Sequence, residues 1–277
     1  MSNLTQRVLS AFVALGLLAL GLSFSTTGVF FLCLLATIIS LFEFSGLWPK
    51  LESELNSSLS FLYRTYFIII GTLFFLMAAK YPHWVFFTLP VFCALISGPT
   101  LWFLAKKENL SNLLKFLGMS IVGIVYCGLM PSISYQIALA NDGLVLFVLH
   151  LSLVFSGDIS AYFAGRFFGA NKLHEVLSPK KTLEGAAGGL LGSVLAGLVW
   201  VFLFKPDVGL PYLLVLFLMT GIFAQLGDLF KSFFKRYANV KDSGGIMPGH
   251  GGILDRIDGV IFSSAVFYMF VLIFFKP

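Results

Sequence analysis

The stretch GAAGGLLGSVLAGLVWVFLF, residues 185–204, carries no charged side chain, and its one hydroxyl group belongs to Ser193. A helix that crosses the hydrocarbon core of a bilayer needs about 20 predominantly apolar residues. This stretch meets that requirement by itself, so we expect it to form a membrane-spanning helix. Segments of the same kind recur along the rest of the chain.

The composition of the chain excludes a water-soluble domain. The 277 residues are 58% hydrophobic and 11% charged, include 32 phenylalanines and have a mean hydropathy of +0.94. Soluble domains carry about 25% charged residues. We therefore predict an all-α, polytopic integral membrane protein that forms a single membrane domain over residues 1–277. Nine segments are long and apolar enough to be its helices: 8–24, 27–47, 62–79, 83–105, 113–138, 143–166, 184–204, 210–230 and 257–275.

Three of these segments have features that affect their interpretation. The first could be a signal peptide, but no small-residue cleavage site follows it and another apolar run comes at once, so we interpret it as a membrane helix. The fourth is interrupted at Ser97-Gly98-Pro99, where we expect a kink. The fifth contains Pro131, which could end it early.

The basic residues indicate the orientation of the chain. Nine spans place the two termini on opposite sides of the membrane. Of the 18 lysines and arginines, 15 lie in the N-terminus and in the loops after the second, fourth, sixth and eighth segments, and the remaining three are Lys80, Lys205 and Lys276. Positive residues stay in the cytoplasm. We therefore expect a plasma (inner) membrane protein with a cytoplasmic N-terminus and an external C-terminus.

Ionisable residues divide the chain into two halves. Residues 1–140 are almost free of them inside the membrane, with Glu43 near a cytoplasmic end as an exception, and we expect a scaffold, a lipid cleft or a dimer contact there. Residues 141–277 contain two polar, glycine-rich segments, and we expect them to carry the catalytic site on the cytoplasmic side.

The first polar segment runs from Ser156 to Gly185. Asp158 precedes Arg166 by eight residues, which places it about 12 Å deeper at helical rise. An ionisable group inside the membrane is a functional candidate, and a structural partner for a nearby cation is an equal alternative. The run Ser178-Pro-Lys-Lys-Thr182 offers lysines that suit a phosphate, before a helix whose N-terminal amides favour an anion. Lys180 and Lys181 could equally follow the positive-inside rule alone.

The second polar segment runs from Gln225 to Asp258. Asp228 ends an apolar stretch, and Asp255 and Asp258 are spaced to share one helical face. Carboxylates close to a basic loop indicate a Mg²⁺ site, because Mg²⁺ is held by one or two carboxylates together with waters and substrate phosphates.

Five glycines, at 244, 245, 249, 251 and 252, lie between these carboxylates. They permit positive φ angles, and successive backbone amides can then surround a phosphate. His250 lies among them, and we expect it to contact substrate rather than to bind the metal.

Residues of this second segment resemble the signature of the phosphatidate cytidylyltransferase family. The resemblance rests on Ser232, Lys235, Arg236, Lys241, Asp242, Gly244, Pro248, His250, Gly251, Gly252, Asp255, Arg256 and Asp258 at the family's spacing. The segments Ser178–Gly185 and Gln225–Asp228 are also similar to this family, whereas the first 140 residues share only its hydropathy. Met247 and Leu183 are small departures, because the family usually has another bulky apolar residue and an aromatic residue there.

The resemblance implies a reaction in which CTP and phosphatidate give CDP-diacylglycerol and pyrophosphate. It also implies an all-helical membrane fold, a homodimer and a Mg²⁺ ion held by Asp228 and Asp255, and it leaves a second, monovalent cation open. The expected partners are CTP, phosphatidate and membrane lipids, and no nucleic acid. The candidate catalytic residues are Asp228, Lys235, Arg236, Lys241, Asp242, His250, Asp255, Arg256 and Asp258. The candidate substrate-binding residues are Asp158, Arg166, Ser178, Lys180, Lys181, Thr182, Glu184, Ser232, Gly251 and Gly252.

Two other functions remain as alternatives. A CTP-dependent polyprenol or phytol kinase would release CDP and would need a general base to deprotonate its alcohol, and aspartate or histidine could serve. A transporter or channel would concentrate ionisable residues near the midplane along a path, whereas here they gather at one face.

Overall fold

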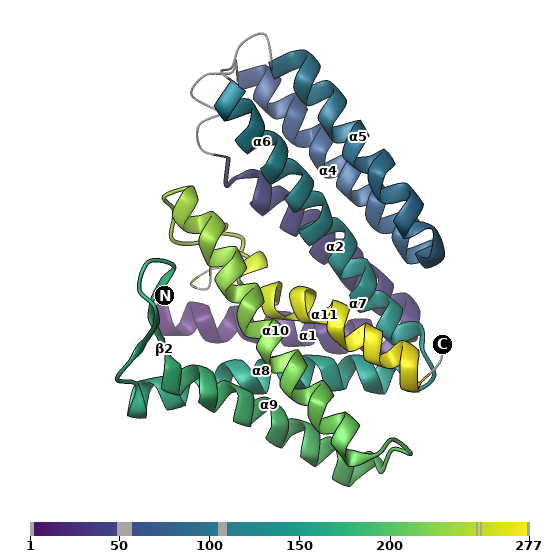
Figure 1. Cartoon of the computed structure of the whole chain (residues 1–277), viewed down its shortest axis with the longest axis vertical. Coiled ribbons are helices and arrows are strands. Elements are labelled where there is room, and N and C mark those ends of the chain that lie inside the picture. The colour runs from purple at the N-terminus through teal and green to yellow at the C-terminus, as the bar shows by residue number, and fades with distance from the viewer. Residues whose placement is uncertain (1–2, 49–56, 105–109, 248, 250, 276–277) are drawn as a thin grey trace. The chain divides into compact units, whose positions relative to one another are not determined.

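The computed structural model describes residues 3–48, 57–104, 110–247, 249 and 251–275. These residues are almost entirely helical (Figure 1). The helices are α1 (Asn3–Ser23), α2 (Ser25–Ser45), α4 (Ser57–Lys80), η1 (Pro82–Trp84), α5 (Val85–Leu104), α6 (Leu110–Gly123), η2 (Ile124–Leu129), α7 (Met130–Leu139), α8 (Gly143–Phe168), α9 (Leu183–Phe204), α10 (Leu210–Tyr237) and α11 (Leu254–Phe274). One antiparallel hairpin of β1 (Lys172–His174) and β2 (Ser178–Thr182) joins α8 to α9.

The predicted fold class is confirmed. Within the described residues, eight helical segments are long and apolar enough to cross a membrane, and Val8–Ser23 is a shorter apolar helix. Together they account for the nine predicted segments. The protein is therefore an all-α, polytopic membrane protein.

The chain forms two compact units. The first comprises Met1–Tyr135 and Val240–Leu254, and the second comprises Gln136–Asn239 and Asp255–Pro277. The glycine-rich loop, residues 243–254, thus belongs to the same unit as the N-terminal helices, although it follows α10 in the chain.

Aromatic side chains fill the core of the first unit. The Trp48 ring lies 4.8 Å from the Phe67 ring and 4.9 Å from the Phe116 ring between centroids, and Tyr63 lies 4.8 Å from Phe116. Such edge-on and tilted pairs contribute about 0.5–1.5 kcal/mol each beyond the burial of their area. They hold α4 and α6 against the residues that follow α2.

Prolines are accommodated inside the helices of the first unit. Pro99 has no N–H to donate, and the carbonyl oxygen of Leu95 accepts instead from the hydroxyl group of Tyr66 at 2.5 Å. Helix α5 continues through this point to Leu104, and the kink expected there stays a prediction. Pro131 does not end the fifth segment, which passes through the π-helical turn η2 and continues to Leu139.

Small residues allow α8 and α9 of the second unit to lie side by side (Figure 1). A Cβ atom added at Gly157 would lie 2.6 Å from the Ser193 hydroxyl oxygen, and one at Gly189 would lie 3.0 Å from the Ala161 Cβ atom. The Ser193 hydroxyl group donates to the carbonyl oxygen of Leu153 at 2.9 Å. Small residues let membrane helices approach closely, and the glycines of α9 that face α8 are Gly185, Gly188, Gly189 and Gly192.

Candidate active site

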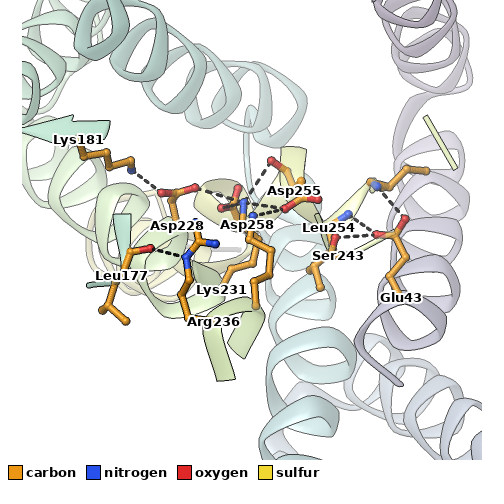
Figure 2. A network of polar contacts seen from close by, with 12 residues as sticks. Glu43, Leu177, Lys181, Asp228, Lys231, Arg236, Ser243, Leu254, Asp255 and Asp258 are labelled. Carbon is orange, nitrogen blue, oxygen red and sulfur yellow. Dashed lines mark hydrogen bonds and ion pairs between the residues drawn. The ribbon is translucent and has the colours of Figure 1, made fainter. Parts of the chain in front are cut away.

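Three carboxylates surround one buried ammonium group in the second unit (Figure 2). The Lys231 Nζ atom lies 3.2 Å from Asp228 Oδ1, 3.4 Å from Asp255 Oδ1 and 2.6 Å from Asp258 Oδ2. It also donates to the backbone carbonyl oxygen of Asp255 at 3.3 Å. The Lys231 side chain is 3% exposed, so these charges interact with little screening by water. We call Lys231 and its three aspartates the Lys231 cluster.

Helical spacing and one close helix contact build this cluster. Asp228 and Lys231 are three residues apart on α10, and Asp255 and Asp258 are three apart at the start of α11, so each pair shares a helical face. A Cβ atom at Gly227 would lie 2.6 Å from the backbone oxygen of Asp258. The absence of a side chain at Gly227 therefore lets α10 and α11 bring the two faces together.

Further basic residues line the edge of the Lys231 cluster. Lys181 pairs with Asp228 Oδ2 at 2.5 Å, and Lys235 pairs with Asp255 Oδ1 at 2.7 Å. The Arg236 Nε atom donates to the carbonyl oxygen of Leu177 at 3.2 Å, which ties the hairpin to α10. The hairpin thereby presents Lys181 to the cluster.

Asp158 lies within electrostatic range of the cluster. The charges that act on its carboxylate are those of Lys181, Asp228, Lys231 and Arg256. It thus belongs to the same charged region, although α8 carries it inside a predicted span.

The other residues predicted on the first polar segment have local contacts. Thr182 caps α9 by accepting from the Gly185 amide at 3.1 Å. Glu184 accepts from the Asn171 side chain at 2.8 Å and from the backbone amides of Ala170 and Asn171. Arg166 donates to the Tyr162 hydroxyl group at 3.3 Å. These bonds shape the hairpin, and a contact of Thr182, Glu184 or Arg166 with substrate stays a prediction.

The glycine-rich loop belongs to the first unit. It turns at Gly249 and Gly251, whose φ angles are 74° and 83°, and the Met247 amide donates to the Gly251 carbonyl oxygen at 2.9 Å. Its two ends meet at the carboxylate of Glu43 (Figure 2). Pro248 and His250 lie outside the described residues.

The other predicted site residues differ in their exposure. Lys180, Arg236, Lys241, Asp242 and Arg256 are exposed, Ser178 and Gly251 are half-buried, and Ser232 and Gly252 are buried.

The Lys231 cluster contains carboxylates, which are among the ligands that Mg²⁺ binds. Two predicted ligands, Asp228 and Asp255, direct carboxylate oxygens at one cationic centre, and Mg²⁺ takes most of its other ligands from water and phosphate. Within the described residues, no group of three or more His, Cys, Asp or Glu side chains is arranged to hold a metal ion by itself. A Mg²⁺ ion held by Asp228 and Asp255 therefore stays a prediction.

Sequence reasoning missed two of these residues. In the sequence Lys231 is one of the basic residues on the predicted cytoplasmic side, although its position three after Asp228 is a usable signal. Glu43 is an isolated acidic residue there, and nothing local links it to Ser243, which follows it by 200 positions.

Comparison with known proteins identifies similar chains. A sequence model described as "Cytidylyltransferase family" matches residues 5–274. A protein of Staphylococcus haemolyticus named phosphatidate cytidylyltransferase is 42% identical over 142 residues, which cover 51% of this chain and 54% of that protein. One of Brucella abortus with the same name is 39% identical over 164 residues, covering 58% of this chain and 59% of that protein. The chain thus spans only about half the length of the curated relatives it matches.

Proposed function

The chain belongs to the cytidylyltransferase family, and from that premise we propose that it transfers a cytidylyl group from CTP to phosphatidate, giving CDP-diacylglycerol and pyrophosphate. The observation that carries the proposal is the Lys231 cluster, in which carboxylates for a cation and lysines for phosphates lie together near one end of two membrane helices. A reaction between two polyanions needs both kinds of group.

The reaction forms one bond and breaks another at the α-phosphorus of CTP. A phosphate oxygen of phosphatidate attacks that phosphorus, and the oxygen that joins the α- and β-phosphates leaves with pyrophosphate. The attacking oxygen is already anionic, so no strong general base is needed. Catalysis then rests on holding the two oxygens in line and neutralising charge.

Basic side chains supply this neutralisation. Lys235 lies 2.7 Å from Asp255 Oδ1, so it can contact phosphates held beside that carboxylate. The phosphates and the departing pyrophosphate would be bound by Arg236, Lys241 and Arg256. Asp242 and His250 are further candidates near Lys241 in the sequence. Lys180 and Lys181 would bind a substrate headgroup.

Asp228 and Asp255 would hold Mg²⁺, which would shield the phosphates' charge and polarise the α-phosphorus. Asp258 and Lys231 would balance and orient these carboxylates, since Lys231 contacts all three.

We further propose that the site lies on the cytoplasmic side of the plasma (inner) membrane, with the N-terminus cytoplasmic and the C-terminus external. The skew of the basic residues supports this orientation, and CTP is a cytoplasmic compound. A homodimer is proposed on the family resemblance.

Product analysis of the purified protein tests the function. In detergent with labelled CTP, phosphatidate and Mg²⁺, we expect CDP-diacylglycerol and an equal amount of pyrophosphate. Asp228→Asn removes one charge at a site of similar shape and should lower turnover at least about 100-fold, as losing a charge-stabilising group commonly does. Its matched control, Asp207→Asn in the exposed loop between α9 and α10, should retain wild-type turnover. CDP release with an alcohol acceptor, and none with phosphatidate, would assign the protein to the lipid kinases instead.

A further inference from the structure

Glu43 is a buried carboxylate near the end of α2, with 2% of the residue exposed. Its Oε1 atom accepts from the Ile253 amide at 3.0 Å, and its Oε2 atom accepts from the Leu254 amide at 2.8 Å and from the Ser243 hydroxyl group at 3.4 Å (Figure 2). All four residues belong to the first unit. One side chain thus receives hydrogen bonds from both ends of the glycine-rich loop, residues 243–254.

The glycines at the ends of this loop make room for the carboxylate. A Cβ atom at Gly244 would lie 2.5 Å from Glu43 Oε1, and one at Gly252 would lie 2.5 Å from Glu43 Oε2. Real Cβ atoms do not approach other atoms so closely, so any larger residue would displace the carboxylate or the loop. Two of the five loop glycines, Gly244 and Gly252, therefore make this contact possible.

The carboxylate also caps a helix. Ile253 and Leu254 stand at the start of α11, where backbone amides have no partner within the helix. The partial positive charge of a helix N-terminus favours a negative group. Glu43 therefore accepts two amides at the end of the first unit's loop segment, those of Ile253 and Leu254.

A cap alone would need only one end of the loop. The additional bond to Ser243 and the fit of Gly244 close the loop at its other end. Glu43 thus bonds to described residues at both ends of the loop, and the hydrogen bond from the Met247 amide to the Gly251 carbonyl oxygen joins two residues between those ends.

We propose that Glu43 is a positioning residue that holds the glycine-rich loop closed in the conformation that binds the phosphates of CTP. The inference rests on the proposed function for the identity of the ligand, while the anchoring of the loop rests on the contacts alone. Glu43 does not touch substrate. Its loss opens the loop and weakens nucleotide binding.

Glu43→Gln is the primary test, because it keeps the volume but replaces one acceptor oxygen with a donor that opposes a backbone amide. Losing a hydrogen bond to a charged group corresponds to about a 10- to 100-fold effect. We expect KM for CTP to rise by about that factor and KM for phosphatidate to change less than about twofold. Hydrogen–deuterium exchange of peptides covering 243–254, measured without CTP, should accelerate at least about tenfold.

Two further variants keep the test informative if Glu43→Gln folds poorly. Ser243→Ala removes only the hydroxyl donor and should change both quantities in the same direction by a smaller factor. Gly244→Ala leaves Glu43 in place but pushes a methyl group against its Oε1 atom, and it should resemble Glu43→Gln. Asp207→Asn is the matched control for loss of an acidic group and should change neither quantity.

The outcomes separate the inference from the proposed function. If wild-type protein makes CDP-diacylglycerol while the Glu43 and Gly244 variants retain normal KM for CTP and normal loop exchange, the inference is overturned and the function stands. A uniform rise in both KM values with unchanged loop exchange also overturns it. If wild-type protein makes no product, the proposed function fails, and the exchange data alone confirm or refute Glu43 as the loop anchor.

Discussion

Replacing Lys231 with methionine removes the ammonium group that Asp228, Asp255 and Asp258 approach to within 3.4 Å. Methionine is apolar, similar in length and compatible with a helix, so the variant changes charge more than shape. The ion pairs of Lys181 with Asp228 and of Lys235 with Asp255 would remain. Deleting one partner of a buried charge pair costs about 3–5 kcal/mol, because the remaining charge stays buried without compensation.

This cost converts into a melting temperature. For a chain of this length each kcal/mol lowers Tm by about 2–4 °C, so Lys231→Met should melt about 6–20 °C below the wild type in detergent without Mg²⁺. Added Mg²⁺ should raise Tm more in the variant than in the wild type, because the freed carboxylates bind the ion more tightly and a ligand of the folded state stabilises it.

Thermal unfolding followed by intrinsic fluorescence or by loss of monodisperse protein measures both effects. Lys205→Met, which removes an exposed lysine after α9, is the matched control and should melt within about 2 °C of the wild type. A Lys231→Met variant that melts with the wild type would show that the ammonium group does not hold the three carboxylates, and the structural basis of the proposed site would be refuted.

Two further predictions concern the elements that hold the site. Gly227→Ala places a methyl group 2.6 Å from the Asp258 backbone oxygen and should lower the free energy of unfolding by about 1–3 kcal/mol. Its control is Gly118→Ala, where nothing lies within 4 Å and Tm should stay unchanged or rise slightly. Equal melting of the two variants would contradict the close contact of α10 and α11. Arg236→Ala removes the hydrogen bond to Leu177 and should accelerate deuterium exchange of residues 172–182 about fivefold, the factor for about 1 kcal/mol. The control Lys205→Ala should leave this exchange rate unchanged. An unchanged exchange rate in Arg236→Ala would mean that the bond does not restrain the hairpin.

The membrane fold was predictable because its signal is local. Each span is a continuous apolar run, and the structure contains a helix at every one of the nine predicted segments. The fate of Pro131 was not predictable, because whether a proline ends a helix depends on which neighbouring groups donate to the carbonyl oxygen that it frees and on the π-helical turn before it.

The candidate site was predictable only in part, for a similar reason. Asp228, Asp255 and Asp258 could be grouped because helical spacing and motif resemblance place them on two adjoining helices. Lys231 reads in sequence as one more cytoplasmic lysine, and its burial among carboxylates follows from the close approach at Gly227. Glu43 could not be assigned, since its partners come from a loop that no periodicity connects to α2.

The bonds of Glu43 also impose an order on the making of the protein. The contacts between α8 and α9 join residues about 40 positions apart, as in the bond from Ser193 to Leu153, so they can form as soon as the second helix leaves the ribosome. Glu43 and Ile253 are 210 positions apart. At a synthesis rate of about 5–20 residues per second, the ribosome needs about 10–40 s after adding Glu43 to reach Ile253 of the loop. The closing of the loop is therefore among the last events of biogenesis, and a chain that stops short of residue 253 leaves the carboxylate of α2 without its two amide donors.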